Sequence, residues 1–293
     1  MIEQSRRLPP AVTIGGDLTV GAIGYGAMQL TGPKVWGEYP DHDKAIALLR
    51  EVVAQGVTYI DTADVYGPHS NEELIREALH PYPENLVIAT KGGFVRGGPE
   101  YSDMSAVGNK YYLRQAAYLS MRRLGLDHID LYYLHTPTMT DVPFEQIVET
   151  LAGMRQDGLI RHIGLSNVSA DQLRTALSIT DIAAVTVQYT VAVRDGAAVR
   201  QLAQDEGIVF SPWHPGTVPG GEPFHAVIDP IAQRHGATPQ QIALAWQLHR
   251  TPGCLPIPGT TSVEHLTENL AAAALRLTQA EVDTITGLTP EDR

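Results

Sequence analysis

The chain has 293 residues, of which 43% are hydrophobic and one is a cysteine, and its formal net charge is −12. Binding to nucleic acids or anionic membranes needs a basic face, so this acidic balance argues against both as main partners. No apolar run approaches the roughly 18 residues of a membrane helix, and the single Cys254 cannot form an internal disulfide.

Two short apolar runs near the start of the chain are separated by Gly15 and Gly16, a pattern typical of a β-hairpin turn. We expect this hairpin, within residues 8–21, to close the bottom of the structure that follows it. The first 13 residues have no apolar centre of the kind that a signal peptide needs, which favours a cytoplasmic protein.

From residue 20 onward, eight apolar, β-rich runs alternate with amphipathic segments. The strand-like runs are residues 20–26, 57–61, 85–91, 128–135, 159–166, 183–189, 207–213 and 253–259. Helical spacing of apolar residues marks residues 41–56, 70–80, 111–125, 142–158, 169–177, 196–207 and 238–249. This alternation predicts a single α/β domain over residues 1–293, a parallel (β/α)8 or TIM barrel preceded by the short hairpin.

Two helix starts carry capping signals. Ser70 with Glu73 three residues later predicts a capping box, and Thr238 before Pro239 predicts an N-cap followed by proline at the first helical position.

A long, glycine-rich and aperiodic stretch follows the third strand, at residues 92–110. A loop in that place should rise from the carboxyl-terminal face of a barrel, so we expect it to be functional.

Polar side chains stand at the carboxyl ends of the predicted strands, where barrel enzymes place their chemistry. Asp61 ends the second strand, with Tyr66 in the loop after it, Lys91 ends the third and His135 the fourth. Each has an ordinary structural explanation: a turn cap, a rim aromatic, a solvated lysine and a buried histidine. Together they fit less well with those explanations, because a lysine at a buried strand end needs a carboxylate.

Asp61, on the neighbouring strand, can supply that carboxylate. The positive charge of Lys91 then lowers the pKa of Tyr66, so the phenol gives up its proton more readily. An aspartate, a lysine, a tyrosine and a histidine at one barrel mouth form a set suited to acid catalysis.

The ordered motifs "GYGAMQL", "DTADVYG", "ATK", "DLYYLH", "HIGLSN", "VQY" and "PIPGTTSVEHLTEN" resemble those of the aldo-keto reductase superfamily over about residues 11–285. The resemblance implies the catalytic tetrad Asp61, Tyr66, Lys91 and His135, and hydride transfer from a reduced nicotinamide to a carbonyl carbon. Tyr66 would donate the proton and Lys91, paired with Asp61, would tune it. His135 would hydrogen-bond the carbonyl oxygen and orient the substrate.

The resemblance also implies where the nicotinamide binds. Ser166, Asn167 and Gln188 would hold its carboxamide, and Phe210 would stack on its ring, although core packing explains Phe210 nearly as well. The loop "HPGTVP" after Trp213 would wrap the pyrophosphate.

The phosphate end of the cofactor site departs from the common pattern of the family. Gly259 and His265 stand where many members have a lysine and an arginine that clamp the 2′-phosphate. The hydroxyls, the helix start and the adenine positions that remain are Thr260, Thr261, Ser262, Glu268 and Asn269. The resemblance implies NADP(H) as the preferred cofactor, and the missing basic pair leaves NAD(H) open.

Within the superfamily, "GYGAMQLTGP", "DTADVYGPH", "IREALHPY" and "GLSNV" resemble the bacterial pyridoxal reductases. They imply a small-molecule aldehyde or ketone substrate, such as pyridoxal or a related cyclic or aromatic carbonyl. Similar strings occur in carbonyl reductases of bacterial secondary metabolism. Candidate pocket walls are Trp36, Tyr39, Phe94 and Trp213, each of which simple packing would also explain.

Three alternatives remain open at this stage: a Schiff-base lyase using Lys91, a redox-neutral lyase or cyclase, and a non-catalytic nicotinamide-binding subunit. A Schiff-base lysine should lack a partner carboxylate, so Asp61 argues against the first. We expect no metal site, and the sequence does not determine the oligomeric state.

Overall fold

A parallel sheet of seven strands forms the centre of the protein, in the order β11–β10–β9–β8–β5–β4–β3. The computed structural model describes residues 11–291, so residues 1–10, which bear on the signal-peptide expectation, lie outside it with residues 292–293. The strands are β3 (Tyr25–Gly26), β4 (Tyr59–Asp61), β5 (Val87–Gly92), β8 (Ile129–Leu134), β9 (Ile160–Ser166), β10 (Ala184–Gln188) and β11 (Val209–Trp213).

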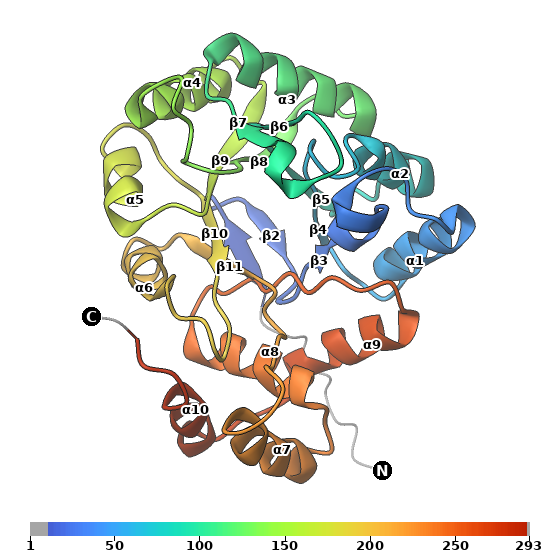
Figure 1. Cartoon of the computed structure of the whole chain (residues 1–293), viewed down its shortest axis with the longest axis vertical. Helices are drawn as coiled ribbons and strands as arrows, with labels where there is room; N and C mark the ends of the chain where they lie inside the picture. Colours follow the sequence, from blue (N-terminus) through green and yellow to red (C-terminus); the bar gives the residue numbers. More distant parts are fainter. Residues whose placement is uncertain (1–10, 292–293) are drawn as a thin grey trace.

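Helices surround this sheet and follow its strands along the chain (Figure 1). The predicted helices are α1 (His42–Ala54), α2 (Ser70–Leu79), α3 (Lys110–Leu124), α4 (Phe144–Gln156), α5 (Ala170–Leu177), α6 (Ala197–Asp205) and α8 (Pro239–Arg250). Three further helices are α7 (Phe224–His235), α9 (Val263–Ala271) and α10 (Gln279–Thr286). The predicted (β/α)8 barrel is confirmed, and no helix within residues 11–291 has the length and apolar content to span a bilayer.

The eighth predicted strand, residues 253–259, is not a regular strand, but its backbone joins both edges of the sheet. The amide of Leu255 donates to the carbonyl of Phe210 on β11 at 2.9 Å. On the other side, the carbonyls of Pro256 and Pro258 accept from Gly24 and Gly26 at 2.9 and 3.3 Å. Prolines have no amide hydrogen to donate in return, so this segment closes the barrel without forming a full ladder.

The predicted hairpin is confirmed as β1 (Val12–Ile14) and β2 (Leu18–Val20), which pair antiparallel. Gly15 and Gly16 form the turn with φ values of 60° and 86°, which glycine adopts without steric cost. The apolar residues of the hairpin pack with Tyr59, Leu131 and Leu255 inside the barrel. The hairpin therefore closes the end opposite the carboxyl ends of the strands.

The two capping predictions have different outcomes. Thr238 is the N-cap of α8 and accepts from the amide of Gln241 at 3.3 Å, as predicted. The capping box at Ser70 is wrong, because α2 already begins at Ser70 and its N-cap residue makes no side-chain bond. The Ser70 hydroxyl instead donates to the carbonyls of Gly37 and Gly67, at 3.1 and 3.4 Å, and fastens the loop before α2.

The stretch of residues 92–110 is more ordered than its composition indicates. It contains an antiparallel hairpin of β6 (Phe94–Arg96) and β7 (Met104–Ala106), which Figure 1 shows beside α3. The hairpin follows β5 directly, so it rises from the carboxyl-terminal face of the barrel, as expected of a functional loop.

Candidate active site

Three of the four polar residues predicted for catalysis meet in a buried cluster at the carboxyl ends of β4 and β5. The ammonium of Lys91 forms a salt bridge with the carboxylate of Asp61, and both residues are buried. The same ammonium donates to the carbonyl of Thr62 at 2.8 Å and lies 3.5 Å from the hydroxyl of Tyr66. The parallel register of β4 and β5 places Asp61 beside Lys91, although 30 residues separate them in the chain.

Burial and the ion pair shift the pKa values of Lys91 and Tyr66 in opposite directions. Burial lowers the pKa of Lys91, but Asp61 and Tyr66 outweigh it, so the pKa lies above the ordinary value and the lysine is charged. For Tyr66, burial raises the pKa more than Lys91 lowers it, so the phenol is protonated at neutral pH. The expected lowering by Lys91 is therefore present, but it does not determine the net shift.

His135 follows β8 and is held by its backbone, whose amide donates to the carbonyl of Gly92 at 2.9 Å. Its ring makes edge contacts with the rings of Tyr66 and Phe94, at centroid distances of 5.8 and 4.9 Å. Burial and the nearby Lys91 charge hold the pKa of His135 well below its usual range. The imidazole is therefore neutral, and it can donate one hydrogen bond without carrying a proton to the substrate.

A cavity of about 890 Å³ opens above these four side chains. It is lined by most of the residues that the sequence indicated. These are Asp61, Tyr66, Lys91, His135, Ser166, Asn167, Trp213, Gly259, Thr260, His265, Glu268 and Asn269. The loop of residues 214–218, predicted to wrap a pyrophosphate, also contributes to the wall. One cavity thus joins the proposed tetrad to the starts of α8 and α9.

Other predicted residues are not on the cavity wall. These are Gln188, Phe210, Thr261, Ser262, Trp36, Tyr39 and Phe94. Phe210 is 1% exposed and packs edge-on against Tyr189, with a centroid distance of 5.6 Å, because it faces the helices rather than the barrel mouth. Ser262 caps its own helix by accepting from the amide of His265 at 3.3 Å. For Phe210, the core-packing explanation thus describes its position in this structure.

Asn167 connects three strand ends at the cavity. Its amide group donates to the carbonyl of His135 at 3.3 Å and to the hydroxyl of Ser166 at 3.0 Å. Its side-chain oxygen accepts from the indole of Trp213 at 3.1 Å. Asn167 has a φ of 59°, a left-handed conformation that asparagine tolerates better than most residues. The residue therefore positions the histidine and the tryptophan in addition to any contact with a ligand.

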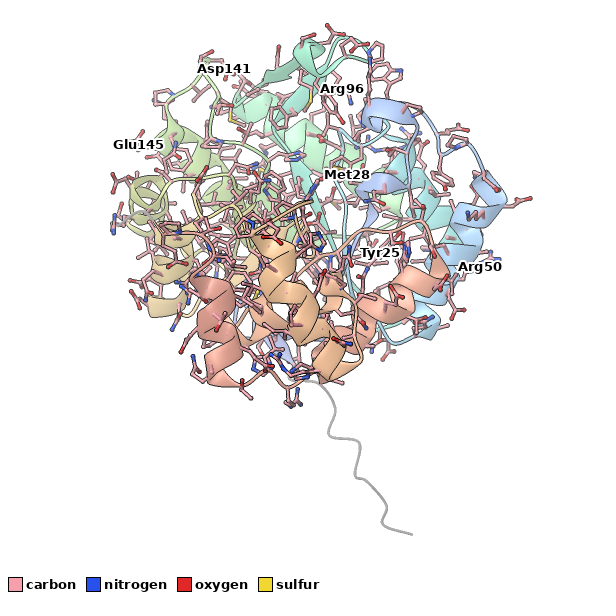
Figure 2. All side chains as sticks on the ribbon, turned by 60° about the horizontal axis from the view of Figure 1, so that its bottom comes forward. Tyr25, Met28, Arg50, Arg96, Asp141 and Glu145 are labelled. Atoms are coloured by element: carbon pink, nitrogen blue, oxygen red, sulfur yellow. The ribbon has the colours of Figure 1, made fainter. Side chains whose placement is uncertain are left out.

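Several lining residues were not singled out by the sequence. They are Met28, Val65, Arg96, Tyr101 and Met104 on the side of the tetrad, Gln29 beside Gly259, and Thr238 and Gln240 at the start of α8. Arg96 and Met28 are labelled in Figure 2. Thr238 did carry a signal, its capping pattern, but only the fold shows that this helix start faces the cavity. For Arg96 the sequence offers no signal beyond its place in the glycine-rich loop.

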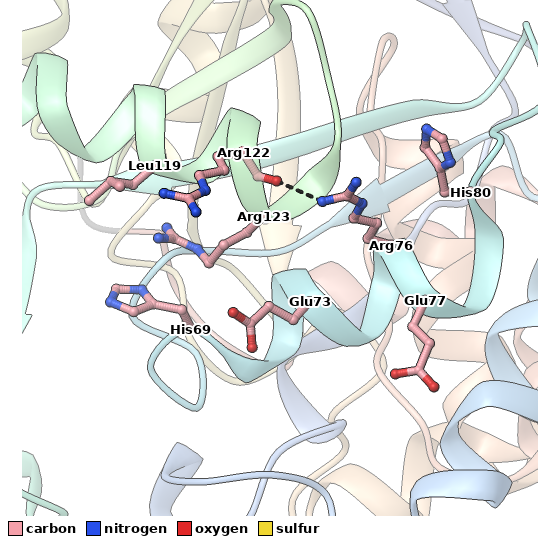
Figure 3. Close-up of a pocket in the computed structure, with 8 residues that line it drawn as sticks. All are labelled: His69, Glu73, Arg76, Glu77, His80, Leu119, Arg122 and Arg123. Atoms are coloured by element: carbon pink, nitrogen blue, oxygen red, sulfur yellow. Dashed lines mark hydrogen bonds between the residues drawn. The ribbon is translucent and has the colours of Figure 1, made fainter.

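A second hollow, of about 730 Å³, lies between α2 and α3 and contains none of the proposed tetrad (Figure 3). Two of its arginines already serve the fold. Arg123 pairs with the buried Glu72 at 2.6 Å, and Arg76 donates to the carbonyl of Arg122 at 3.0 Å. Within residues 11–291 no group of three metal-binding side chains comes together. The first cavity is therefore the candidate active site.

The sequence matches a family model and a known protein over most of its length. The family model "Aldo/keto reductase family" matches residues 22–217 and 223–290. The chain is 42% identical to pyridoxine 4-dehydrogenase of Escherichia coli over 285 residues, which cover 94% of this chain and 97% of that protein.

Two solved structures resemble the fold over almost its whole length. A thermostable aldo-keto reductase in complex with the inhibitor epalrestat has a TM-score of 0.84 and 29% identity, covering 95% of this chain and 99% of that one. An aldo/keto reductase of Klebsiella pneumoniae in complex with NADP and acetate has a TM-score of 0.80 and 26% identity, covering 97% of both chains.

Proposed function

The chain belongs to the aldo/keto reductase family, and we propose that it reduces an aldehyde or ketone to an alcohol with NADPH as the hydride donor. One observation carries this proposal: a protonated, buried Tyr66 lies 3.5 Å from a charged Lys91, and both line the same cavity as a neutral His135. Such a set can donate a proton to an oxygen that gains negative charge.

A reduced nicotinamide, when bound, supplies a hydride to the carbonyl carbon. The protein supplies the proton and the orientation. Tyr66 gives its phenolic proton to the carbonyl oxygen, which completes the alcohol. Lys91 stabilises the negative charge that develops on the phenol oxygen, and Asp61 keeps Lys91 charged inside the protein. His135 donates a hydrogen bond to the carbonyl oxygen and orients it toward Tyr66.

The far end of the cavity fits a ligand with phosphate groups. Thr238 and Gln240 at the start of α8 and His265 in the first turn of α9 line it. Helix N-termini bind phosphate through first-turn amides that capping leaves without a partner, and here Thr238 and Ser262 each accept from one amide, that of Gln241 and that of His265. At the other end, the hydroxyl of Thr186 is buried without a partner among the described residues and lines the cavity. Both ends therefore offer donors suited to a dinucleotide.

We propose NADP(H) rather than NAD(H), on the strength of these helix starts and of the NADP-bound Klebsiella relative. Gly259 and His265, which stand in the sequence where many family members have a basic pair for the 2′-phosphate, both line the cavity. Measuring kcat/KM with NADPH and with NADH tests the choice. A higher value with NADH would show that the helix starts do not replace the missing basic pair.

For the substrate we propose a flat, cyclic or aromatic carbonyl compound of the pyridoxal type, which the identity to pyridoxine 4-dehydrogenase supports. The test is NADPH oxidation with pyridoxal beside a panel of other aldehydes and ketones. If pyridoxal fails while another carbonyl is reduced, the substrate assignment falls and the reaction class stands.

Replacing Tyr66 by phenylalanine tests the reaction itself. The change removes one hydroxyl and keeps the ring, so cofactor binding, followed by its fluorescence, should persist. General acid catalysis contributes about 10²–10⁴-fold, and kcat should fall by that range. Equal turnover by wild type and Tyr66→Phe would defeat the assignment of Tyr66 as proton donor.

A charged Lys91 also weighs against a Schiff-base mechanism, which needs an unprotonated amine. Reduction with borohydride in the presence of a carbonyl substrate should therefore leave Lys91 unmodified, as mass spectrometry of the peptides can show.

A further inference from the structure

The β6–β7 hairpin forms the wall of the cavity on the side of the tetrad, through Arg96, Tyr101 and Met104. The hairpin has only three residue pairs, from Phe94↔Ala106 to Arg96↔Met104. A two-stranded hairpin of this length is marginally stable by itself, so contacts with the rest of the protein must determine its position.

At the end of the hairpin farther from β5, Arg96 makes hydrogen bonds both to the rest of the protein and within the loop of the hairpin. Its guanidinium donates to the carbonyls of Lys34 and Val35, at 3.0 and 2.9 Å, and to that of Pro99 at 2.6 Å. Lys34 and Val35 belong to the 3-10 helix η2 (Pro33–Val35), which follows β3. One side chain thus joins the hairpin tip to a segment about 60 residues earlier in the chain.

Two aromatic rings lie beside the guanidinium of Arg96. Its Cζ atom lies 5.2 Å from the ring centroid of Trp36 and 5.6 Å from that of Tyr101. Trp36, which the sequence indicated as a pocket wall, therefore supports the arginine that holds the wall. A cation near aromatic faces gains attraction in addition to its hydrogen bonds.

Two other polar contacts of the hairpin lie at its tip and at its start. Lys34 pairs with Glu100 at 2.5 Å, but their side chains are 51% and 54% exposed, and such surface pairs contribute little. The hydroxyl of Tyr112 donates to the carbonyl of Phe94 at 2.7 Å, which fastens the start of the hairpin beside β5.

We propose that Arg96 is the positioning residue that holds the β6–β7 hairpin against η2, and that it thereby selects flat aromatic carbonyl compounds over small aliphatic ones. Through Arg96, Tyr101 and Met104 are kept at the cavity, where an aromatic ring and a thioether offer a surface for a flat substrate. A small aldehyde can reach Tyr66 without touching this wall. The selectivity rests on the proposed reductase function, whereas the anchoring of the hairpin does not.

The first test compares benzaldehyde with propanal as substrates of NADPH-dependent reduction. In Arg96→Met, kcat/KM for benzaldehyde should fall about tenfold or more, chiefly through KM, because several charge-assisted hydrogen bonds are lost. The value for propanal and the Kd of NADPH should change by less than about twofold, because neither depends on the wall. In Arg96→Lys, kcat/KM for benzaldehyde should lie between the values of wild type and Arg96→Met, since one ammonium cannot reproduce the several N–H donors of the guanidinium. Lys34→Gln, which removes only the exposed pair, is the matched control and should behave as wild type.

The second test needs no activity. Chymotrypsin cleaves after tyrosine, and Tyr101 on the hairpin is 59% exposed. Cleavage there should be at least about fivefold faster in Arg96→Met than in wild type or Lys34→Gln, because opening of the hairpin limits the cut.

The outcomes separate the two claims. Equal losses with benzaldehyde and propanal, or no loss with either, would overturn the selectivity assigned to Arg96. Unchanged cleavage after Tyr101 would overturn the anchoring. Wild type that reduces neither aldehyde nor any other carbonyl would defeat the proposed function and the selectivity with it, while cleavage would still decide the anchoring.

Discussion

Replacing Lys91 by methionine removes one charge and keeps much of the side-chain volume. The ammonium lies 3.5 Å from the Tyr66 hydroxyl. At an effective dielectric constant of about 20, two unit charges at that separation attract by about 5 kcal/mol. If roughly half a charge has developed on the phenol oxygen in the transition state, the loss is about 2.4 kcal/mol, or roughly 50-fold in kcat.

The assay is kcat for NADPH oxidation at a saturating carbonyl concentration, measured from neutral to alkaline pH. In the proposed mechanism reduction needs protonated Tyr66, whose pKa already lies above the ordinary value because burial outweighs Lys91. Without Lys91 that pKa rises further, so the alkaline limb of the profile should move to higher pH. The unpaired Asp61 should also lower the free energy of unfolding by about 3–5 kcal/mol.

The double variant Lys91→Met/Asp61→Leu is the control for stability. It removes the ion pair entirely, so it should recover most of the unfolding free energy and none of the lost kcat. Wild-type kcat in Lys91→Met, or recovery of kcat together with stability in the double variant, would refute the role assigned to Lys91.

Three other predictions concern stability. The pKa of His135 lies well below 6.5. Below about pH 6.5 the unfolded chain therefore binds more protons than the folded protein, and the free energy of unfolding decreases as the pH is lowered, by up to about 1.4 kcal/mol per pH unit. Urea unfolding should show that the free energy of unfolding changes less between pH 7 and pH 5.5 in His135→Gln than in wild type; equal changes in the two proteins would contradict this. Partial burial raises the pKa of Glu281, but hydrogen bonds from Thr278, His235 and Arg234 lower it to about 2. The ionised Glu281 carboxylate therefore stabilises the folded protein above pH 4.5, its pKa in the unfolded chain, and this stabilisation is lost as the pH falls toward 2. Thermal unfolding of Glu281→Gln should show a free energy of unfolding lower by about 1–2 kcal/mol at pH 7, with the difference from wild type vanishing near pH 2. In Gly92→Ala the new Cβ would lie 1.9 Å from the Tyr132 hydroxyl, so denaturant unfolding should show a loss of about 1–3 kcal/mol, against little change in Gly97→Ala, whose nearest atom is 3.8 Å away.

Local patterns were sufficient for most of the barrel. Apolar runs of strand length alternate with helical periodicity, and a parallel barrel follows because each element must bury an apolar face. The same reasoning placed Asp61, Lys91 and His135 at one mouth, since carboxyl ends of parallel strands meet on one face. The need of a buried ammonium for a carboxylate then led to the Asp61–Lys91 pair, which the structure contains.

Other features depend on contacts between segments far apart in the chain. The last predicted strand has the right apolar pattern, but Pro256 and Pro258 cannot donate to a ladder, so only its neighbours show how it closes the barrel. Ser70 has the right spacing for a capping box, yet its hydroxyl donates to the carbonyl of Gly67 in the loop before α2 and to that of Gly37, 33 residues earlier in the chain.

The sequence by itself determined the barrel, the hairpin that closes it and the Asp61–Lys91 pair beside the proposed proton donor, because strand and helix periods and the cost of a buried charge act locally or between neighbouring strands. Only the tertiary structure decided which side of β11 Phe210 occupies, that the start of α8 faces the cavity, and that Arg96 joins the β6–β7 hairpin to η2. These depend on where side chains meet across the fold, and a hydrogen bond between positions about 60 residues apart leaves no periodic trace in a single sequence.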